Sequence, residues 1–243
     1  MYQAAAALNA NSQWQEAIAD NLASSSIPGF KKQELSFGAV ESRLKTSAAT
    51  AVQRASMPQS AVKTNFSAGE LKYTGVNTDV ALEGNGFLQV QLPDGNIGYT
   101  RDGELHLSAS GQLVTKQGYA VLGESGPILF DLNNPAKITI SSTGEVSQGT
   151  DLKGKLLAVE FEQPGLLTQI GRGCFLANNP NIKSSPSATA IFHQGYVETA
   201  NTSAAMEMAH LITSLRSYEA NQRVIQMQDD RLGKTITELG TPS

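Results

Sequence analysis

Apolar residues near the C-terminus recur at the spacing of one long helix. From residue 208 onward, a row of ten positions about 3.5 residues apart has eight apolar members: Met208, Leu211, Leu215, Tyr218, Gln222, Ile225, Asp229, Leu232, Ile236 and Leu239. Side-chain oxygens of Asn201, Thr202 and Ser203 can cap the start of this helix, and Gly240 ends it. A stripe this narrow predicts a partner helix, with packing on the chain's own domain as the alternative.

A second, weaker stripe predicts a helix over residues 2–25. Its members have the same spacing but are mostly small or polar: Ala4, Leu8, Asn11, Gln15, Ile18 and Leu22. Such a helix is marginal in water on its own, and its small residues allow a neighbouring helix to approach closely. Pro28 and Gly29 suit the centre of a type II turn, so the helix is expected to end before them.

The middle of the chain changes to a period of two, which is typical of strands. An Asp94-Gly95 turn separates two of these alternating segments, and strands are expected at 80–82, 87–92, 97–100, 112–115 and 156–161. The stretch 107–113 recurs 33 residues later at 140–146, which indicates a repeated strand–turn–strand unit.

Two stretches lack a sustained period. Residues 34–74 are polar and rich in Ser, Ala and Thr, which indicates an extended connector with short strands near Phe37 and Leu71. Residues 175–194 contain two prolines and are expected to return as a loop towards the C-terminal helix.

Composition excludes some classes of protein, but it does not point to a reaction or a ligand. The 243 residues are 40% hydrophobic and 6% aromatic, include 22 glycines, and carry a net charge of −4. This fits β-structure with many turns joined to polar helices, and it offers no basic surface for nucleic acid. No apolar run is long enough to span a membrane, and no basic residue precedes Lys31. We therefore expect no membrane insertion and no cleavable signal peptide.

No motif predicts catalysis, a cofactor or a metal ion. Gly84-Asn85-Gly86 lacks the third glycine and the helix of a dinucleotide site. Ser42-Arg43-Leu44-Lys45 lacks the companion motifs of a serine hydrolase, and the lone Cys174 has no base near it in the sequence. Metal-ligand spacing is missing around the three histidines, His106, His193 and His210. We expect no catalytic, cofactor-binding or metal-binding residue.

Motifs at opposite ends of the chain resemble the signatures of bacterial flagellar rod and hook proteins. The run Ala19-Asp20-Asn21-Leu22-Ala23-Ser24-Ser25-Ser26-Ile27-Pro28-Gly29-Phe30-Lys31 is similar to the family's A-N-N-L-A-N-x-x-T-P-G-[FY]-K. Gly195-Tyr196-Val197-Glu198-Thr199-Ala200-Asn201, followed by Thr202, is similar to G-x-[LV]-E-x-S-N-V-[ND], and Arg216-Ser217-Tyr218-Glu219-Ala220-Asn221 to R-[AS]-[FY]-E-x-[NQ]. Five positions depart from these patterns and leave the Pro-Gly turn intact: Asp20, Ser24, Ile27, Ala200 and Thr202.

The resemblance implies an α+β fold, in which a central, mainly β domain carries N- and C-terminal helices that pair as a coiled-coil-like α domain. The implied parts are 1–33 (first helix and turn), 34–74 (connector), 75–194 (β domain) and 195–243 (second helix). A fragment of residues 75–194 is expected to fold alone. The implied motif residues are Asn21, Leu22, Pro28, Gly29, Phe30, Gly195, Glu198, Asn201, Arg216 and Glu219. The expected assembly interface consists of Leu8, Ile18, Leu22, Met208, Leu211, Leu215, Tyr218, Ile225, Leu232 and Ile236.

The function implied by the resemblance is structural. The chain would be an axial component of the flagellar basal-body rod, self-assembling through its terminal helices into the tubular drive shaft that serves motility. Expected partners are further copies, other rod and hook proteins, and the flagellar type III export apparatus, and the expected location is the periplasm-spanning rod. Two alternatives remain open: a hook-type axial protein, or a β-rich binding module with a helical oligomerisation stalk. A hydrolase using Ser42 or Cys174 would need a positioned base that the sequence does not show.

Overall fold

The chain forms two compact units, each assembled from segments that lie far apart in the sequence. The helical unit comprises Met1–Leu22, Gln33–Thr64 and Ala204–Ser243. The β unit comprises Ala23–Lys32 and Asn65–Ser203. The computed structural model describes residues 2–42, 55–171 and 173–240.

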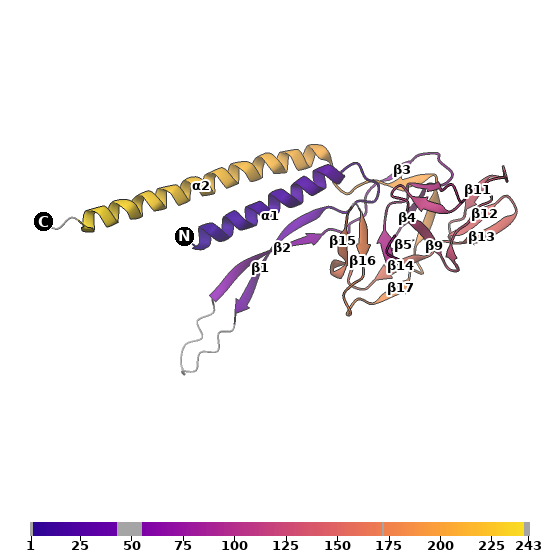
Figure 1. The fold of residues 1–243 in the computed structure, drawn as a ribbon, viewed down its shortest axis with the longest axis horizontal. Helices are drawn as coiled ribbons and strands as arrows, with labels where there is room; N and C mark the ends of the chain where they lie inside the picture. The colour runs from indigo at the N-terminus through magenta and orange to yellow at the C-terminus, as the bar shows by residue number, and fades with distance from the viewer. Residues whose placement is uncertain (1, 43–54, 172, 241–243) are drawn as a thin grey trace, which may run out of the picture. The chain divides into compact units, whose positions relative to one another are not determined.

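Two long helices lie side by side in the helical unit, α1 (Tyr2–Ser24) and α2 (Ala204–Gly240) (Figure 1). The side-chain amide of Asn11 on α1 donates a hydrogen bond to the hydroxyl of Ser217 on α2 at 3.4 Å. Alanines and unbranched side chains favour a helix along both segments. The prediction of helices at both ends of the chain is confirmed, and the two helices pack together.

A long β-hairpin completes the helical unit. Its strands, β1 (Gln33–Ser42) and β2 (Ala55–Thr64), pair antiparallel over their full length. Residues 34–74 were expected to be an extended connector with short strands near Phe37 and Leu71. Strands do lie at both places, β1 and the short β3 (Leu71–Tyr73), but the long pairing of β1 with β2 was not expected. A ribbon of two strands encloses no core of its own, so its sequence has no need to alternate between apolar and polar residues. This is why the pattern did not reveal it.

The β unit contains seventeen short strands within its described residues. After β3, its strands and one short 3₁₀ turn are β4 (Val80–Glu83), β5 (Phe87–Gln91), β6 (Ile97–Thr100), β7 (Leu105–Leu107), β8 (Leu113–Thr115), β9 (Ala120–Gly123), β10 (Gly126–Pro127), β11 (Ile138–Ile140), β12 (Glu145–Gln148), β13 (Asp151–Lys155), β14 (Ala158–Phe161), η1 (Pro164–Leu166), β15 (Thr168–Ile170), β16 (Cys174–Leu176), β17 (Ser184–Pro186), β18 (Ile191–Gln194) and β19 (Tyr196–Glu198). The central, mainly β domain predicted from the period of two is confirmed.

The main sheet of the β unit runs in the order β15-β16-β6-β5-β9-β8-β7, and β14 adds to β5. A three-stranded sheet, β11-β12-β13, and two ribbons, β18-β4 and β19-β3, complete the unit. Three of these strands, β16, β17 and β18, lie within or at the edge of residues 175–194, which were expected to be loop. They are three or four residues long, too short to show a sustained alternation, and β18 pairs with the distant β4.

Alternation along β5 explains why two hydrophobic clusters form on opposite faces. Leu88 and Val90 point into the larger cluster, while Phe87 points into a smaller aromatic one. The aromatic cluster contains Phe87, Tyr99, Val159, Phe161, Leu167 and Phe175. Burying the side chains of both clusters removes apolar surface from water, and this is the main favourable contribution to the folding of the β unit.

The predicted repeat forms two turns with the same hydrogen bonds. Gly111 N–H donates to Ser108 O at 2.9 Å, and Gly144 N–H donates to Ser141 O at 3.0 Å. Both glycines have positive φ, 79° and 87°, which is the conformation that glycine adopts without strain. The prediction of a repeated strand–turn–strand unit is confirmed.

Candidate functional site: a buried charged junction and an exposed helix face

Glu198 of the C-terminal motif has a carboxylate that is 1% exposed. Its Oε1 lies 2.5 Å from Nζ of Lys31 and accepts a hydrogen bond from the backbone N–H of Gly69 at 2.7 Å. Its Oε2 lies 3.3 Å from Nη1 of Arg101. Lys31 and Arg101 are also buried. We call Lys31, Arg101 and Glu198 the charged junction. It joins both terminal motifs to the loop after β6.

The Pro28-Gly29 turn packs directly on this junction. The N–H of Gly29 donates a hydrogen bond to the backbone carbonyl of Glu198 at 2.7 Å. The φ of Gly29 is +66°, and a Cβ at this position would lie 2.2 Å from the carbonyl carbon of Arg101. Both the left-handed backbone and the lack of space therefore require glycine here.

Asn201 continues the contact between the two motifs. Its backbone N–H donates to Phe30 O at 3.2 Å, and its Oδ1 accepts a hydrogen bond from Lys32 N–H at 2.8 Å. Its Nδ2 donates to Asn65 O at 2.8 Å and to Ser67 O at 3.2 Å. An amide supplies donor and acceptor together, so this side chain binds two separate stretches of backbone, one at residue 32 and one at residues 65–67.

The charged junction holds two cations and one carboxylate, and carbonyl oxygens solvate the excess positive charge. Lys31 Nζ donates to Ser67 O at 2.8 Å. Arg101 donates to Leu82 O at 3.1 Å and to Gly84 O at 2.5 Å. Burial lowers the pKa of Lys31 and of Arg101, and in each case the attraction of the shared carboxylate opposes that shift. A buried charge that loses its partner is strongly destabilising, so both cations depend on the shared carboxylate of Glu198.

Asp102 adjoins the junction and is 2% exposed. Its Oδ1 accepts a hydrogen bond from Glu104 N–H at 3.0 Å, whereas its Oδ2 has no hydrogen-bond partner in the part of the chain that the structure describes. Burial raises the pKa of Asp102 to about 6, and the backbone hydrogen bond from Glu104 acts against this. At neutral pH the carboxylate is therefore a destabilising charge inside the β unit.

Replacing Asp102 by asparagine is expected to stabilise the β unit at neutral pH and to reduce its pH dependence. The pKa of about 6 in the folded chain exceeds the ordinary value of 3.8, so the folded state binds the proton more tightly. The resulting stabilisation is complete below pH 3.8 and is lost as pH rises through about 6. The loss in the wild type is about 3 kcal/mol at its limit, and the variant should not show it.

Urea unfolding at about pH 5 and about pH 7.5 measures this difference. Asp94→Asn, in an exposed turn, is the matched control. The pKa of Asp79 is also raised by burial, so a shallower pH dependence of the same sign should remain in the Asp102→Asn variant. An identical pH dependence in the Asp102→Asn variant and the wild type would contradict the assignment.

Asn21 of the N-terminal motif lies in the helical unit and is also buried. Its Nδ2 donates to Gln33 O at 2.9 Å, and its Oδ1 accepts a hydrogen bond from Gln33 N–H at 2.8 Å. The side chain therefore fastens the end of α1 to the first residue of β1. An aspartate could not do this because an ionised carboxylate has no donor.

The remaining motif residues fall into two groups. Leu22 and Pro28 are half-buried, Phe30 is buried, and Gly195 accepts a hydrogen bond on its carbonyl from Thr74 N–H at 2.8 Å. On α2, two motif residues are exposed, Arg216 and Glu219. Most of the motif residues therefore make contacts within the β unit, whereas Arg216 and Glu219 lie on the surface of α2.

One face of α2 is buried or half-buried, and it is largely polar. Ser217, which bonds to Asn11 of α1, lies beside this face, so it is the side that meets α1. Its members recur three and four residues apart: Glu207, Leu211, Ser214, Tyr218, Asn221 and Ile225. Three of the ten residues in the row predicted from sequence also belong to this face, namely Leu211, Tyr218 and Ile225.

Apolar members of the predicted row that do not lie on the face towards α1 are exposed wherever their side chains are described. Met208, Ile212 and Leu215 share one side of α2 at spacings of four and three, and Leu215 is 47% exposed. We call these three residues the apolar patch of α2. Leu232 is also exposed, and the side chain of Ile236 lies outside the described residues. On α1, Ile18 is buried while Leu8 and Leu22 are half-buried.

The sequence did not predict a site role for two residues of the charged junction, Lys31 and Arg101. A signal existed for Lys31, because it ends one terminal motif and the opposite charge, Glu198, stands in the other. Arg101 lies in a turn-like Arg-Asp-Gly stretch, and nothing local distinguishes it from a solvated turn residue. Its partner is 97 positions away.

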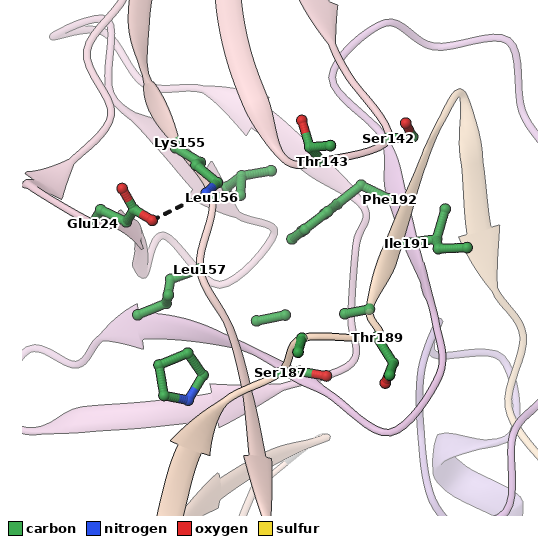
Figure 2. A pocket seen from close by; sticks show the side chains of 14 residues that line it. Glu124, Ser142, Thr143, Lys155, Leu156, Leu157, Ser187, Thr189, Ile191 and Phe192 are labelled. Atoms are coloured by element: carbon green, nitrogen blue, oxygen red, sulfur yellow. Dashed lines mark ion pairs between the residues drawn. The ribbon is translucent and has the colours of Figure 1, made fainter.

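An open cavity of about 710 Å³ lies elsewhere in the β unit (Figure 2). The residues lining it come from four places: the turn between β9 and β10, the turn before β12, the stretch from the end of β13 to the start of β14, and the stretch from the end of β17 into β18. Its two charged residues, Glu124 and Lys155, pair at 3.2 Å and are about half exposed. Hydroxyl and aliphatic groups form most of the remaining wall, including Ser142, Thr189 and Ile191. The cavity does not include the motif residues.

The surroundings of Cys174 give no support for catalytic chemistry there. Cys174 is buried, and burial raises the pKa of its thiol, which disfavours the reactive thiolate. Ser42 ends β1, and its side chain lies outside the described residues. Within 2–42, 55–171 and 173–240, no cluster of three or more His, Cys, Asp or Glu side chains is arranged to hold a metal ion. None of the helices in those ranges has the length and hydropathy to cross a bilayer.

Comparison with known proteins connects these sites to a family. A family model described as "Flagellar hook protein FlgE/F/G D1 domain" matches residues 81–148, and one described as "Flagellar basal body rod FlgEFG protein C-terminal" matches residues 193–238. The flagellar basal-body rod protein FlgG of Buchnera aphidicola (subsp. Acyrthosiphon pisum) is 34% identical over 89% of this chain and 90% of its own length. The chain belongs to the flagellar basal-body rod protein family. FlgG of Borreliella burgdorferi (33% identical, 96% of each chain) and FlgF of Escherichia coli K12 (30%, 96% and 95%) agree with this.

Membership of the rod protein family confirms the resemblance seen in the terminal motifs, and it confirms a structural component of the flagellar rod. The family is structural, and its members' names give the flagellar basal body as their location. The first matched region contains Arg101 and Asp102, and the second contains Glu198, Asn201 and the first nine turns or so of α2. The charged junction is thus built from both matched regions together with the N-terminal segment.

Proposed function

We propose that this rod protein assembles with further copies of itself through α2, into the tubular drive shaft of the flagellum. The observation that carries the proposal is the apolar patch, Met208, Ile212 and Leu215, which stays exposed although α2 already packs on α1. Contiguous exposed apolar surface on a soluble chain marks an interaction site. In the assembly, the interface extends along the predicted residues of both helices.

The two faces of α2 have different chemistry, and this supports different roles for them. The face towards α1 carries Glu207, Ser214 and Asn221, whose polar side chains specify one pairing at the expense of stability. The patch beside it is apolar, so covering it with a second copy removes apolar surface from water and stabilises the contact. Contacts between unlike faces of successive copies generate an open helical assembly when the rotation between copies does not close a ring, and this is the geometry proposed for the tube. In that tube the helices pair in a coiled-coil-like manner.

Membership of the rod protein family supports a wider setting for this assembly. In this proposal the chain joins other rod and hook proteins, occupies the rod where it crosses the periplasm, and is delivered by the flagellar type III export apparatus. Nucleic acid and membrane insertion have no part in this function. The net charge of −4 is consistent with a chain that binds no nucleic acid.

Polymerisation of the purified chain tests the proposal. Concentrated full-length protein is expected to form filaments or tubes in negative-stain electron micrographs and to sediment, while a chain ending at residue 203 stays monomeric. The shorter chain retains the whole β unit and lacks α2. Equal sedimentation of both chains would refute assembly through α2. A full-length chain that stays monomeric at every concentration would refute self-assembly.

A further inference from the structure

The β unit is discontinuous, because it starts with Ala23–Lys32 and ends with residues directly before α2. We propose that residues 195–201 are its closing element, so that the unit cannot fold until this segment is present. The family's C-terminal motif then has a second role beside assembly: it determines when the chain folds. This inference concerns the isolated chain and does not depend on polymerisation.

Backbone hydrogen bonds make residues 195–201 a structural part of the β unit. β19 pairs antiparallel with β3, so Tyr196 stands opposite Tyr73. Gly195 N–H donates to Asp79 O at 2.8 Å, and its carbonyl accepts from Thr74 and Gly75. Without this segment, β3 has no strand partner, and the turn that enters β4 loses its fixed geometry.

Electrostatics make the segment indispensable. Lys31 and Arg101 both form their ion pairs with Glu198. A chain that stops before Glu198 would have to bury two cations without this carboxylate, or leave that part of the unit open to water. The Gly29 turn and the Phe30 backbone would also lose their partners, Glu198 O and Asn201 N–H.

The consequence concerns the order of events as the chain is made. N-terminal domains usually fold first during synthesis. Here the N-terminal segment 23–32 has its docking site in residues 195–201, so the β unit stays open until nearly all of its own residues exist. The same geometry reverses the expectation that a 75–194 fragment folds alone, since that fragment lacks Glu198, Lys31 and β19.

Two truncated chains test the closing role. A chain of residues 1–203 is expected to show near-ultraviolet circular dichroism, a cooperative melt and slow trypsin cleavage. A chain of residues 1–194 is expected to lack all three and to be cleaved at least ten times faster, although it keeps eighteen of the nineteen strands found in the described residues. Adding a synthetic 195–203 peptide should slow this cleavage, whereas the same peptide carrying Glu198→Gln should not.

Three results would overturn the inference. The first is a cooperative melt of the 1–194 chain close to that of the 1–203 chain. The second is loss of cooperative melting in the 1–203 chain while the full chain retains it, because closure would then need α2. The third is equal protection by the two peptides, which would remove the role assigned to the Glu198 carboxylate.

Discussion

Replacing Glu198 by glutamine is expected to lower the free energy of unfolding of the β unit by about 3–5 kcal/mol, because two buried cations lose their shared counter-ion. Glutamine has nearly the same shape, so packing is retained and the effect reports the charge. Urea unfolding of the 1–203 chain, followed by near-ultraviolet circular dichroism, gives the midpoint and the slope from which this loss is obtained.

Lys31→Met is the matched control for that variant, and its expected loss is smaller, about 1–3 kcal/mol. The methionine chain fills the same volume, and Glu198 keeps Arg101 and the N–H of Gly69 as partners. The double variant should lose less than the sum of the two single losses, since the residues interact directly. A Glu198→Gln loss below about 1 kcal/mol, or one equal to that of Lys31→Met, would contradict the unequal roles described here.

Leu215→Asp is expected to abolish assembly while leaving the isolated chain as stable as the wild type. Leu215 is 47% exposed in the single chain, so a carboxylate there stays hydrated before assembly. In an assembled interface the same carboxylate would be buried without a partner, which costs several kcal/mol and weakens each contact by about a hundredfold or more. Sedimentation and electron microscopy measure assembly, and thermal unfolding measures the single chain.

Two neighbouring positions separate this effect from a general effect of charge. Thr213→Asp, at an exposed site on another side of α2, should assemble normally. Ser214→Asp, at a fully buried site on the face towards α1, should lower the stability of the helix pair even in the single chain. Normal assembly of the Leu215→Asp chain, or a block by Thr213→Asp of the same size, would show that the apolar patch is not the interface.

Much of the architecture of this rod protein could be predicted because its signals are local. The 3.5-residue spacing after Met208 and the alanines after Tyr2 determine helices through contacts within one or two turns. The serine–glycine turns at Gly111 and Gly144 form from hydrogen bonds that span four residues. Alternation around Phe87 and Leu88 determines which side chains face which cluster. In each case the interacting atoms are neighbours in the sequence.

Which face of α2 meets α1 was decided only by the tertiary structure. The apolar patch, which contains Met208 and Leu215, is more apolar than the face that contains Ser214, yet it is the Ser214 face that lies towards α1. A helix can pack with any face that has a complementary partner, and the partner here is Asn11 on a segment 206 residues away. Hydrophobic spacing therefore predicted that α2 packs with a helix, but not which of its sides each neighbour takes.

The charged junction depends even more on tertiary structure. Glu198 was recognised as a motif residue, but its partners Lys31 and Arg101 lie 167 and 97 positions away. A charged residue in a turn normally remains in water, and only the arrival of three distant segments makes burial of these charges favourable. The sequence by itself determined the helices, the turns and the alternating strands, whose stabilising contacts are local. The charged junction inside the β unit follows from the tertiary structure alone, because an ion pair depends on distance in space and not on separation along the chain.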